Sequence, residues 1–117
     1  MDTIATMQRS RTLAIDNLTD VTRVKMNHLG GRLRAARQRR GWSYERCAEF
    51  AKVSTTTIKG IERGDPAIGF GFYVAVLQAF GMVTELDGLC LICKDHFLGP
   101  GAAESGITKK VTFDDDL

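Results

Sequence analysis

The stretch 41–64, GWSYERCAEFAKVSTTTIKGIERG, constrains the fold more strongly than any other part of the chain. Ser43 and Ser54 each stand before an apolar helical pattern, and serine is a preferred residue at helix N-caps. Only Lys52 and Val53 remain to connect the two patterns. This spacing predicts two short helices joined by a tight turn, with both serines acting as caps whatever else they contact.

Apolar residues on both sides of this stretch also repeat with helical spacing. Leu29, Leu33 and Ala36 lie at i, i+4 and i+7, which predicts a helix that begins near Leu29. Gly41 ends this helix as a C-terminal glycine commonly does. The segment 68–80 is the most apolar part of the chain, and we expect it to form a fourth helix buried against the first three.

A fifth helix is expected after Thr84. The fold class that follows is all-α, with a five-helix domain over residues 29–98. A flexible arm, 1–28, precedes this domain and a tail, 99–117, follows it. Within the tail, residues 107–113 form either a short edge strand or part of a disordered end.

The charges of the chain are unevenly distributed. Nine of its 16 Lys and Arg residues lie within 1–40, whereas seven of its 14 Asp and Glu residues lie within 70–117. A basic front half suits a protein with one face on phosphate, but ordinary solvated surfaces explain both halves equally well. No apolar run reaches the ~18 residues of a membrane span, and the N-terminus lacks the apolar core of a secretory signal. We therefore expect a cytoplasmic protein without a membrane partner.

The second helix of the central stretch opens with four hydroxyl residues, 54–57. Exposed side chains at the start of a helix can reach base edges in the DNA major groove. Thr55 and Thr56 point away from the apolar face, and Lys59 lies one turn beyond them. We predict Thr55, Thr56 and Lys59 as base-contacting residues; the alternative for the threonines is an ordinary exposed turn. Gly60 is expected on the same outward arc, where it lets the backbone approach DNA closely.

Phosphate contacts are predicted around these base contacts, so double-stranded DNA is the predicted partner. Basic, hydroxyl and tyrosine side chains commonly bind the DNA backbone, as do helix N-termini. The predicted phosphate-binding residues are Arg39, Arg40, Ser43, Tyr44, Ser54 and Arg63. Surface charge explains Arg39 and Arg40 equally well, and the Tyr44 ring is equally explained as a cover over the core.

The segment from Leu29 to Leu89 resembles the Xre/lambda-repressor-like helix-turn-helix family. The matching residues are LGGRLRAARQRRGWSYERCAEFAKVSTTTIKGIERGDP, followed by the helix FYVAVLQAFGM. The resemblance implies a five-helix domain whose third helix contacts the bases, usually as a homodimer on a palindromic operator. It also implies a structural ion pair between Arg37 and Glu62. Where the family usually has glutamine, this chain has Tyr44.

A narrower resemblance concerns the segment GDPAIGFGFYVAVLQAFGM, which is similar to HipB-type antitoxins. Such proteins repress their own operon and hold a toxin kinase. The similarity implies a transcriptional repressor that serves as the antitoxin of a toxin–antitoxin operon, with a toxin protein as partner. Two alternatives stay open. A phage-type or general repressor needs no toxin, and a protein-interaction module would neutralise a toxin enzyme through residues 1–28 and 99–117.

Three potential metal ligands, Cys90, Cys93 and His96, form a C-x-x-C-x-x-H pattern. Most structural zinc sites have four ligands, so a small zinc protein is retained only as a third alternative. The pattern lacks the βαβ context of a thioredoxin-like redox pair, and Cys47 is expected in the core. His28 and His96 have no evident catalytic partners. We therefore expect no enzyme activity, no metal and no cofactor.

Overall fold

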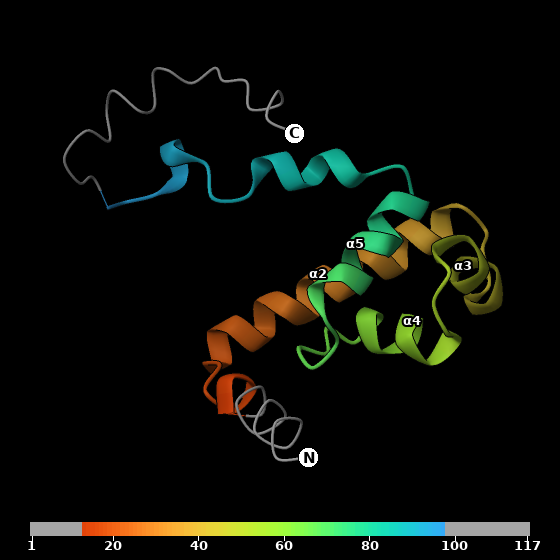
Figure 1. Cartoon of the computed structure of the whole chain (residues 1–117), viewed down its shortest axis with the longest axis horizontal. Helices are drawn as coiled ribbons and strands as arrows, with labels where there is room; N and C mark the ends of the chain where they lie inside the picture. The colour runs from red at the N-terminus through yellow and green to blue at the C-terminus, as the bar shows by residue number, and fades with distance from the viewer. Residues whose placement is uncertain (1–12, 98–117) are drawn as a thin grey trace, which may run out of the picture. The chain divides into compact units, whose positions relative to one another are not determined.

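The computed structural model describes residues 13–97, and regular structure in this part of the chain is helical throughout. A short helical segment at 13–16 comes first. The elements that follow are α2 (Asp20–Arg39), α3 (Tyr44–Ala51), α4 (Thr55–Glu62), α5 (Phe70–Ala79) and the 3-10 helices η1 (Val83–Gly88) and η2 (Ile92–Lys94) (Figure 1). The predicted all-α fold class is confirmed. Two compact units divide between Val83 and Thr84.

The longest helix, α2, begins well before the predicted start at Leu29. Thr19 caps it, because the Thr19 hydroxyl accepts a backbone N–H hydrogen bond at 3.1 Å. Residues 20–28 are therefore helical, although the sequence predicted a flexible arm there. The apolar pattern missed this start because Val21 and Val24 in the first turns remain exposed and add nothing to the buried face.

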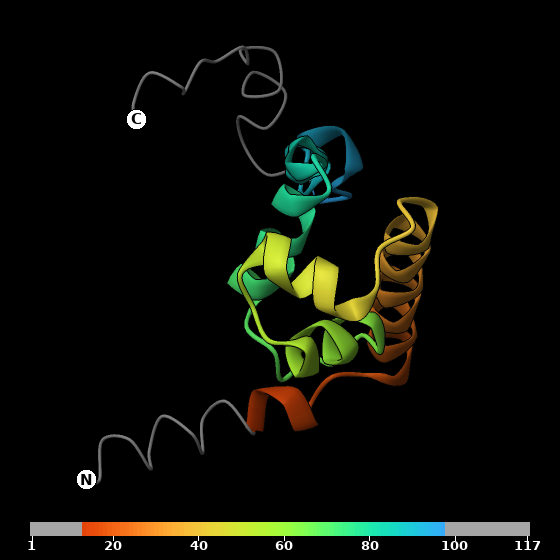
Figure 2. The ribbon, with the colours of Figure 1, turned by 90° about the vertical axis from the view of Figure 1, so that its right-hand side faces the viewer.

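The two short helices and their tight turn lie where the sequence predicted them. Ser43 caps α3 by accepting a hydrogen bond from the Arg46 N–H at 3.0 Å. Ser54 caps α4 in the same way, with the Thr57 N–H at 3.0 Å. Between them Lys52 reverses the chain with a left-handed φ of 61°. The result is that α4 packs against both α2 and α3 (Figure 2).

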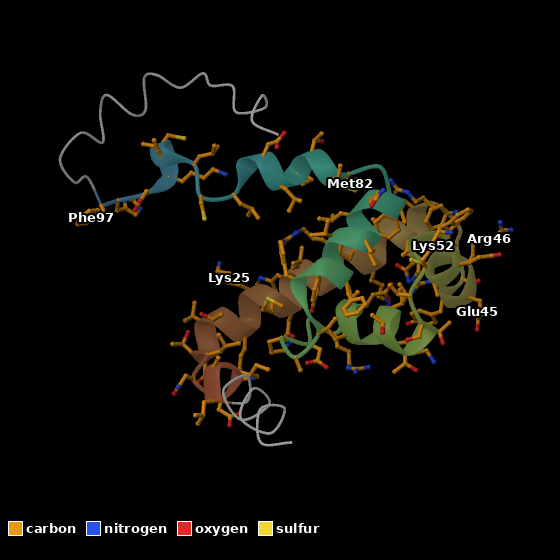
Figure 3. The ribbon with its side chains drawn as sticks, viewed as in Figure 1. Lys25, Glu45, Arg46, Lys52, Met82 and Phe97 are labelled. Carbon is orange, nitrogen blue, oxygen red and sulfur yellow. The ribbon has the colours of Figure 1, made fainter. Side chains whose placement is uncertain are left out.

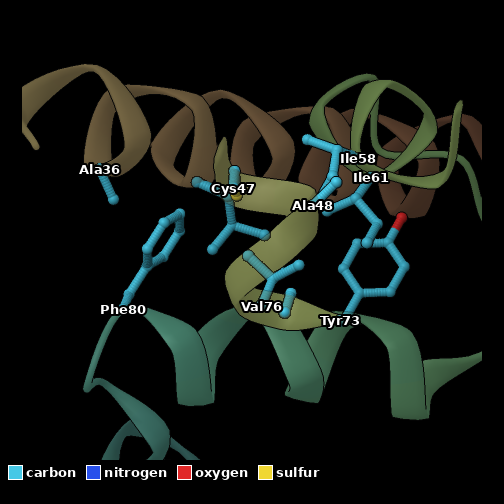
Figure 4. Close-up of a cluster of buried hydrophobic side chains, with 10 residues drawn as sticks. Ala36, Cys47, Ala48, Ile58, Ile61, Tyr73, Val76 and Phe80 are labelled. Atoms are coloured by element: carbon cyan, nitrogen blue, oxygen red, sulfur yellow. The ribbon is translucent and has the colours of Figure 1, made fainter. Parts of the chain in front are cut away.

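One apolar core joins these helices to α5, the predicted fourth helix. Tyr73, Val76 and Phe80 point from the α5 side into the core (Figure 4). The buried hydrophobic residues are Leu33, Ala36, Cys47, Ala48, Ala51, Ile58, Ile61, Tyr73, Val76 and Phe80. Cys47 is 0% exposed, as expected for a core residue. Burial raises the pKa of its thiol, because the thiolate form loses its hydration.

The chain beyond α5 differs from the prediction of a fifth α-helix. It forms η1 and η2, and neither of them buries a residue. Leu89, Leu91 and Ile92 are exposed, and Cys90 adopts a left-handed φ of 58° between the two 3-10 turns. A short α-helix without a buried apolar face gains too little to form, which explains the difference. The predicted strand at 107–113 lies outside the described residues.

Candidate nucleic-acid interface

The first turn of α4 presents hydroxyl groups of unequal availability. The Ser54 hydroxyl accepts the Thr57 N–H and also donates to the Thr57 Oγ1 at 2.9 Å. Both of these side chains are therefore occupied by the helix cap. Thr55 is half-buried and Thr56 is exposed. Of the two threonines predicted to contact bases, Thr56 is the more accessible.

Lys59 completes a solvent-facing surface that we call the outer face of α4, made of Thr55, Thr56 and Lys59. Residues three and four apart on a helix lie side by side, so these three side chains share one face. The opposite face is anchored, since Ile58 and Ile61 are each 1% exposed. The buried isoleucines thus determine which side chains of α4 point outward.

Arg37 and Glu62 form a nearly buried ion pair between α2 and the end of α4, in the arrangement that the family resemblance implies. The Arg37 Nε–Glu62 Oε2 distance is 2.7 Å and the Nη2–Oε1 distance is 3.2 Å. Arg37 Nη1 also donates to the Trp42 carbonyl at 2.8 Å, which ties the pair to the start of α3. The hydrogen bond with Glu62 raises the pKa of Arg37, so the guanidinium stays charged. The pair holds α4 at a defined position on α2.

Tyr44, the first residue of α3, lies over the side chains of two neighbouring helices. The Arg37 Cζ lies 4.2 Å from the Tyr44 ring centroid. The Lys59 Nζ lies 5.3 Å from the same centroid. Tyr44 is half-buried and packs against the core, as the structural alternative expected. The ring therefore connects the buried ion pair to the outer face of α4.

A close backbone contact between α2 and the end of α4 was not anticipated from the sequence. A Cβ atom at Gly30 would lie 2.5 Å from the Glu62 carbonyl oxygen and 2.7 Å from the Gly64 nitrogen. Gly64 itself has a left-handed φ of 75° and lies against the backbone of Met26. Adjacent glycines at 30 and 31 were the available signal, but only the fold shows that Gly30 is the one in contact.

The structure corrects the expected role of Gly60. This glycine is buried rather than outward-facing. A Cβ atom there would collide with the Cδ1 of Ile68, which follows α4 along the chain. Gly60 therefore makes room for Ile68, and the expectation of a close approach to DNA is wrong.

Apart from Tyr44, described above, the predicted phosphate-binding residues fall into two groups. Ser43, Arg39 and Arg63 are exposed, and Ser54 is exposed at the start of α4. Arg40 instead ties α2 to the end of α5: it donates to the Ala36 and Phe80 carbonyls at 2.9 and 2.8 Å. Its guanidinium also lies 4.8 Å from the Phe80 ring centroid. We therefore assign Arg40 to the fold, whereas a phosphate contact of Arg39 and Arg63 stays a prediction.

The zinc alternative gains no support from the described residues. Cys90 and Cys93 are exposed free thiols, and His96 is also exposed. Within residues 13–97, no group of three or more potential ligands is arranged to hold a metal ion. In the same part of the chain, no helix has the length and hydrophobicity needed to cross a bilayer.

Comparison with known protein families matches residues 28–87 to a family model described as a helix-turn-helix domain. Neither the curated proteins nor the solved structures contain a match to the chain. The matched residues make up just over half of the 117 and include all of α3, α4 and α5. The chain therefore belongs to the helix-turn-helix domain family, and its function is that of a DNA-binding regulator.

Proposed function

We propose that this protein is a sequence-specific transcriptional repressor that binds a palindromic operator as a homodimer. The observation that carries the proposal is the outer face of α4. It presents Thr56 and Lys59 to solvent, while the buried inner face and the Arg37–Glu62 pair hold the helix in place. A rigid helix with short polar and basic side chains suits contact with base edges. The proposal assigns the protein no enzyme activity and places it in the cytoplasm.

In this mechanism α4 enters the major groove with its N-terminal end foremost. The Thr56 hydroxyl donates to or accepts from a base edge, and its methyl group packs against a thymine methyl. Lys59 donates to guanine acceptors. Half-buried Thr55 contributes from the side of the helix. Together these contacts distinguish one operator sequence from others.

Contacts with the sugar–phosphate backbone of the DNA orient the helix in the groove, and they do not depend on the base sequence. The Ser43 hydroxyl accepts the Arg46 N–H, which leaves its own proton free to donate to a phosphate oxygen. Arg39 and Arg63 supply positive charge at the exposed ends of α2 and α4. Such contacts add affinity on any DNA and weaken as the salt concentration rises.

A homodimer places two copies of α4 in successive major grooves. The two half-sites of a palindrome then lie about 34 Å apart, one turn of the double helix. Occupation of such a site over a promoter blocks transcription by steric exclusion. The dimer rests on the family resemblance, and light scattering of the purified protein with and without operator tests it.

Selection of bound sequences from random DNA tests the proposal, followed by Thr56→Ala. We expect a palindromic consensus, and a loss of about 1–3 kcal/mol for the variant on that consensus with little change on random DNA. Gln38→Ala, an exposed change on α2, is the matched control and keeps both affinities. Equal losses of Thr56→Ala on both DNAs would refute the base contact.

A narrower role, that of an autoregulating antitoxin, rests on the resemblance of residues 64–82 to HipB-type proteins. A toxin enzyme then binds the same protein that represses the operon. Deletion of residues 99–117 tests this role, with toxin binding and operator binding measured separately. Loss of toxin binding with operator binding retained supports an antitoxin. The absence of a toxin gene beside the gene for this protein would instead indicate a phage-type or general repressor.

A further inference from the structure

The Tyr44 ring lies between the nearly buried Arg37–Glu62 ion pair and the outer face of α4. Two cationic side chains lie over it, with Arg37 Cζ at 4.2 Å and Lys59 Nζ at 5.3 Å from the ring centroid. Both distances are within the ~6 Å at which a cation is attracted to an aromatic face. The ring therefore contacts both the ion pair that holds α4 and a residue of the outer face.

The two cations differ in their freedom to move. All three guanidinium nitrogens of Arg37 donate hydrogen bonds, to the Glu62 carboxylate and to the Trp42 carbonyl. Arg37 therefore provides a fixed platform for the ring of Tyr44, which is itself half-buried. Lys59 is exposed, and its side chain is long and flexible. Because hydrogen bonds hold Arg37 and the Tyr44 ring packs against it, we expect the attraction to act mainly on the position of Lys59.

We propose that Tyr44 is a positioning residue for Lys59: its ring holds the ammonium group in place to donate to one guanine of the operator half-site. This inference rests on the proposed function. A lysine is a flexible point charge, so its selectivity depends on where the ammonium group is held. For an exposed ammonium group, attraction to a ring enriches the held position by roughly two- to five-fold. The O6 and N7 atoms of guanine are the acceptors that a lysine recognises in the major groove.

The experiment uses the full chain and the operator obtained by selection from random DNA. Binding is measured for Lys59→Met, Tyr44→Leu, Tyr44→Phe and the double variant Tyr44→Leu/Lys59→Met, on the operator and on single base-pair substitutions of it. We expect Lys59→Met to lose roughly five- to 100-fold of the discrimination at one G·C pair. Tyr44→Leu loses part of the discrimination at the same pair, Tyr44→Phe keeps it, and the double variant loses no more than Lys59→Met.

Lys25→Met is the matched control for the lost charge. Lys25 is exposed on α2, at the opposite end of the first unit from α3 (Figure 3). Its replacement leaves base discrimination unchanged. Circular dichroism confirms that each variant is folded before its binding constants are compared.

Two outcomes of the binding measurements would overturn the inference. Losses that multiply in the double variant mean that Tyr44 and Lys59 act independently. Failure of Tyr44→Phe to keep discrimination means that the phenol hydroxyl contacts DNA itself, and that the ring is not the active group.

A measurement without DNA separates this inference from the proposed function. With Lys59 held over the ring, the ring current of Tyr44 should shift the NMR signals of the Lys59 ε-methylene group in the free protein. We expect this shift to persist in Tyr44→Phe and to vanish in Tyr44→Leu. A wild-type protein without the shift refutes the positioning role, whereas a protein that has the shift but selects no DNA sequence refutes the proposed function.

Discussion

The two faces of the short helix α4 differ in burial: one is packed into the core and the other is open to solvent. On the inner face, Ile58 and Ile61 are each 1% exposed, and the helix ends in a nearly buried ion pair. On the outer face, Thr56 and Lys59 are exposed. Inner residues are held by packing that tolerates little change, while outer residues have few neighbours to disturb. The difference shows that the residues that maintain the fold lie on one face of α4, and the residues predicted to contact bases lie on the other.

Arg37→Met tests the inner face most severely. The substitution leaves the Glu62 carboxylate nearly buried without its partner, which we expect to lower the free energy of unfolding by about 3–5 kcal/mol. Urea denaturation followed by circular dichroism measures the loss. The double variant Arg37→Met/Glu62→Leu should recover most of the stability, because no charge is then left unpaired. A single variant as stable as the wild type would show that the pair does not hold α4.

Gly30→Ala tests the close contact between α2 and α4. The new methyl group meets backbone atoms of the α4 terminus, and we expect a loss of about 1–3 kcal/mol or more in thermal or urea unfolding. Gly31→Ala is the matched control on the same helix, since nothing lies within 4 Å of its Cβ position. It should raise stability by up to about 1 kcal/mol through better helix propensity. Similar effects at both positions would contradict the close contact.

Ser54 lies at the start of α4, between its two faces, and Ser54→Ala tests its role as the helix cap. It removes the cap of α4, and we expect a loss of about 1 kcal/mol in stability. Operator affinity is expected to fall as well, because the first turn that carries Thr56 loses its anchor. Ser54→Asp keeps a capping acceptor and should restore most of the stability. Denaturation and DNA-binding titrations on the same samples distinguish the two effects.

Arg63→Ala is expected to have the smallest effect on the fold, because Arg63 is exposed. Stability should remain within about 0.5 kcal/mol of the wild type. Binding should weaken alike on operator and random DNA, and the slope of log K against log salt should fall by about 1. Titrations at several salt concentrations provide this slope. A loss confined to the operator would place Arg63 among the base contacts instead.

Local signals were sufficient to predict the central stretch. Ser43 and Ser54 are caps, Lys52 reverses the chain, and Gly41 ends α2 with a left-handed φ of 69°. Each of these assignments depends on neighbours within a few residues. Helix caps and turns are properties of short segments, so a sequence pattern is enough to find them.

Contacts with other segments explain what the sequence did not reveal at Gly60 and Arg40. The sequence predicted Gly60 on the outward arc of α4, yet Ile68 covers it and it is buried. Arg40 belongs to a run of basic residues, yet its guanidinium binds the carbonyl of Phe80 across the domain. Helical periodicity describes one helix at a time, so it contains no information about what another segment places against that helix.

The backbone contact at Gly30 and Gly64 has a consequence for how this protein can evolve. A side chain at either position would meet backbone atoms of another segment, so we expect substitutions there to lower stability whatever DNA is bound. Thr56 and Lys59 carry no such restriction, because they lie away from the contact. If the proposed function holds, single substitutions on the outer face of α4 can therefore change the operator while the packing of α2 against α4 stays the same.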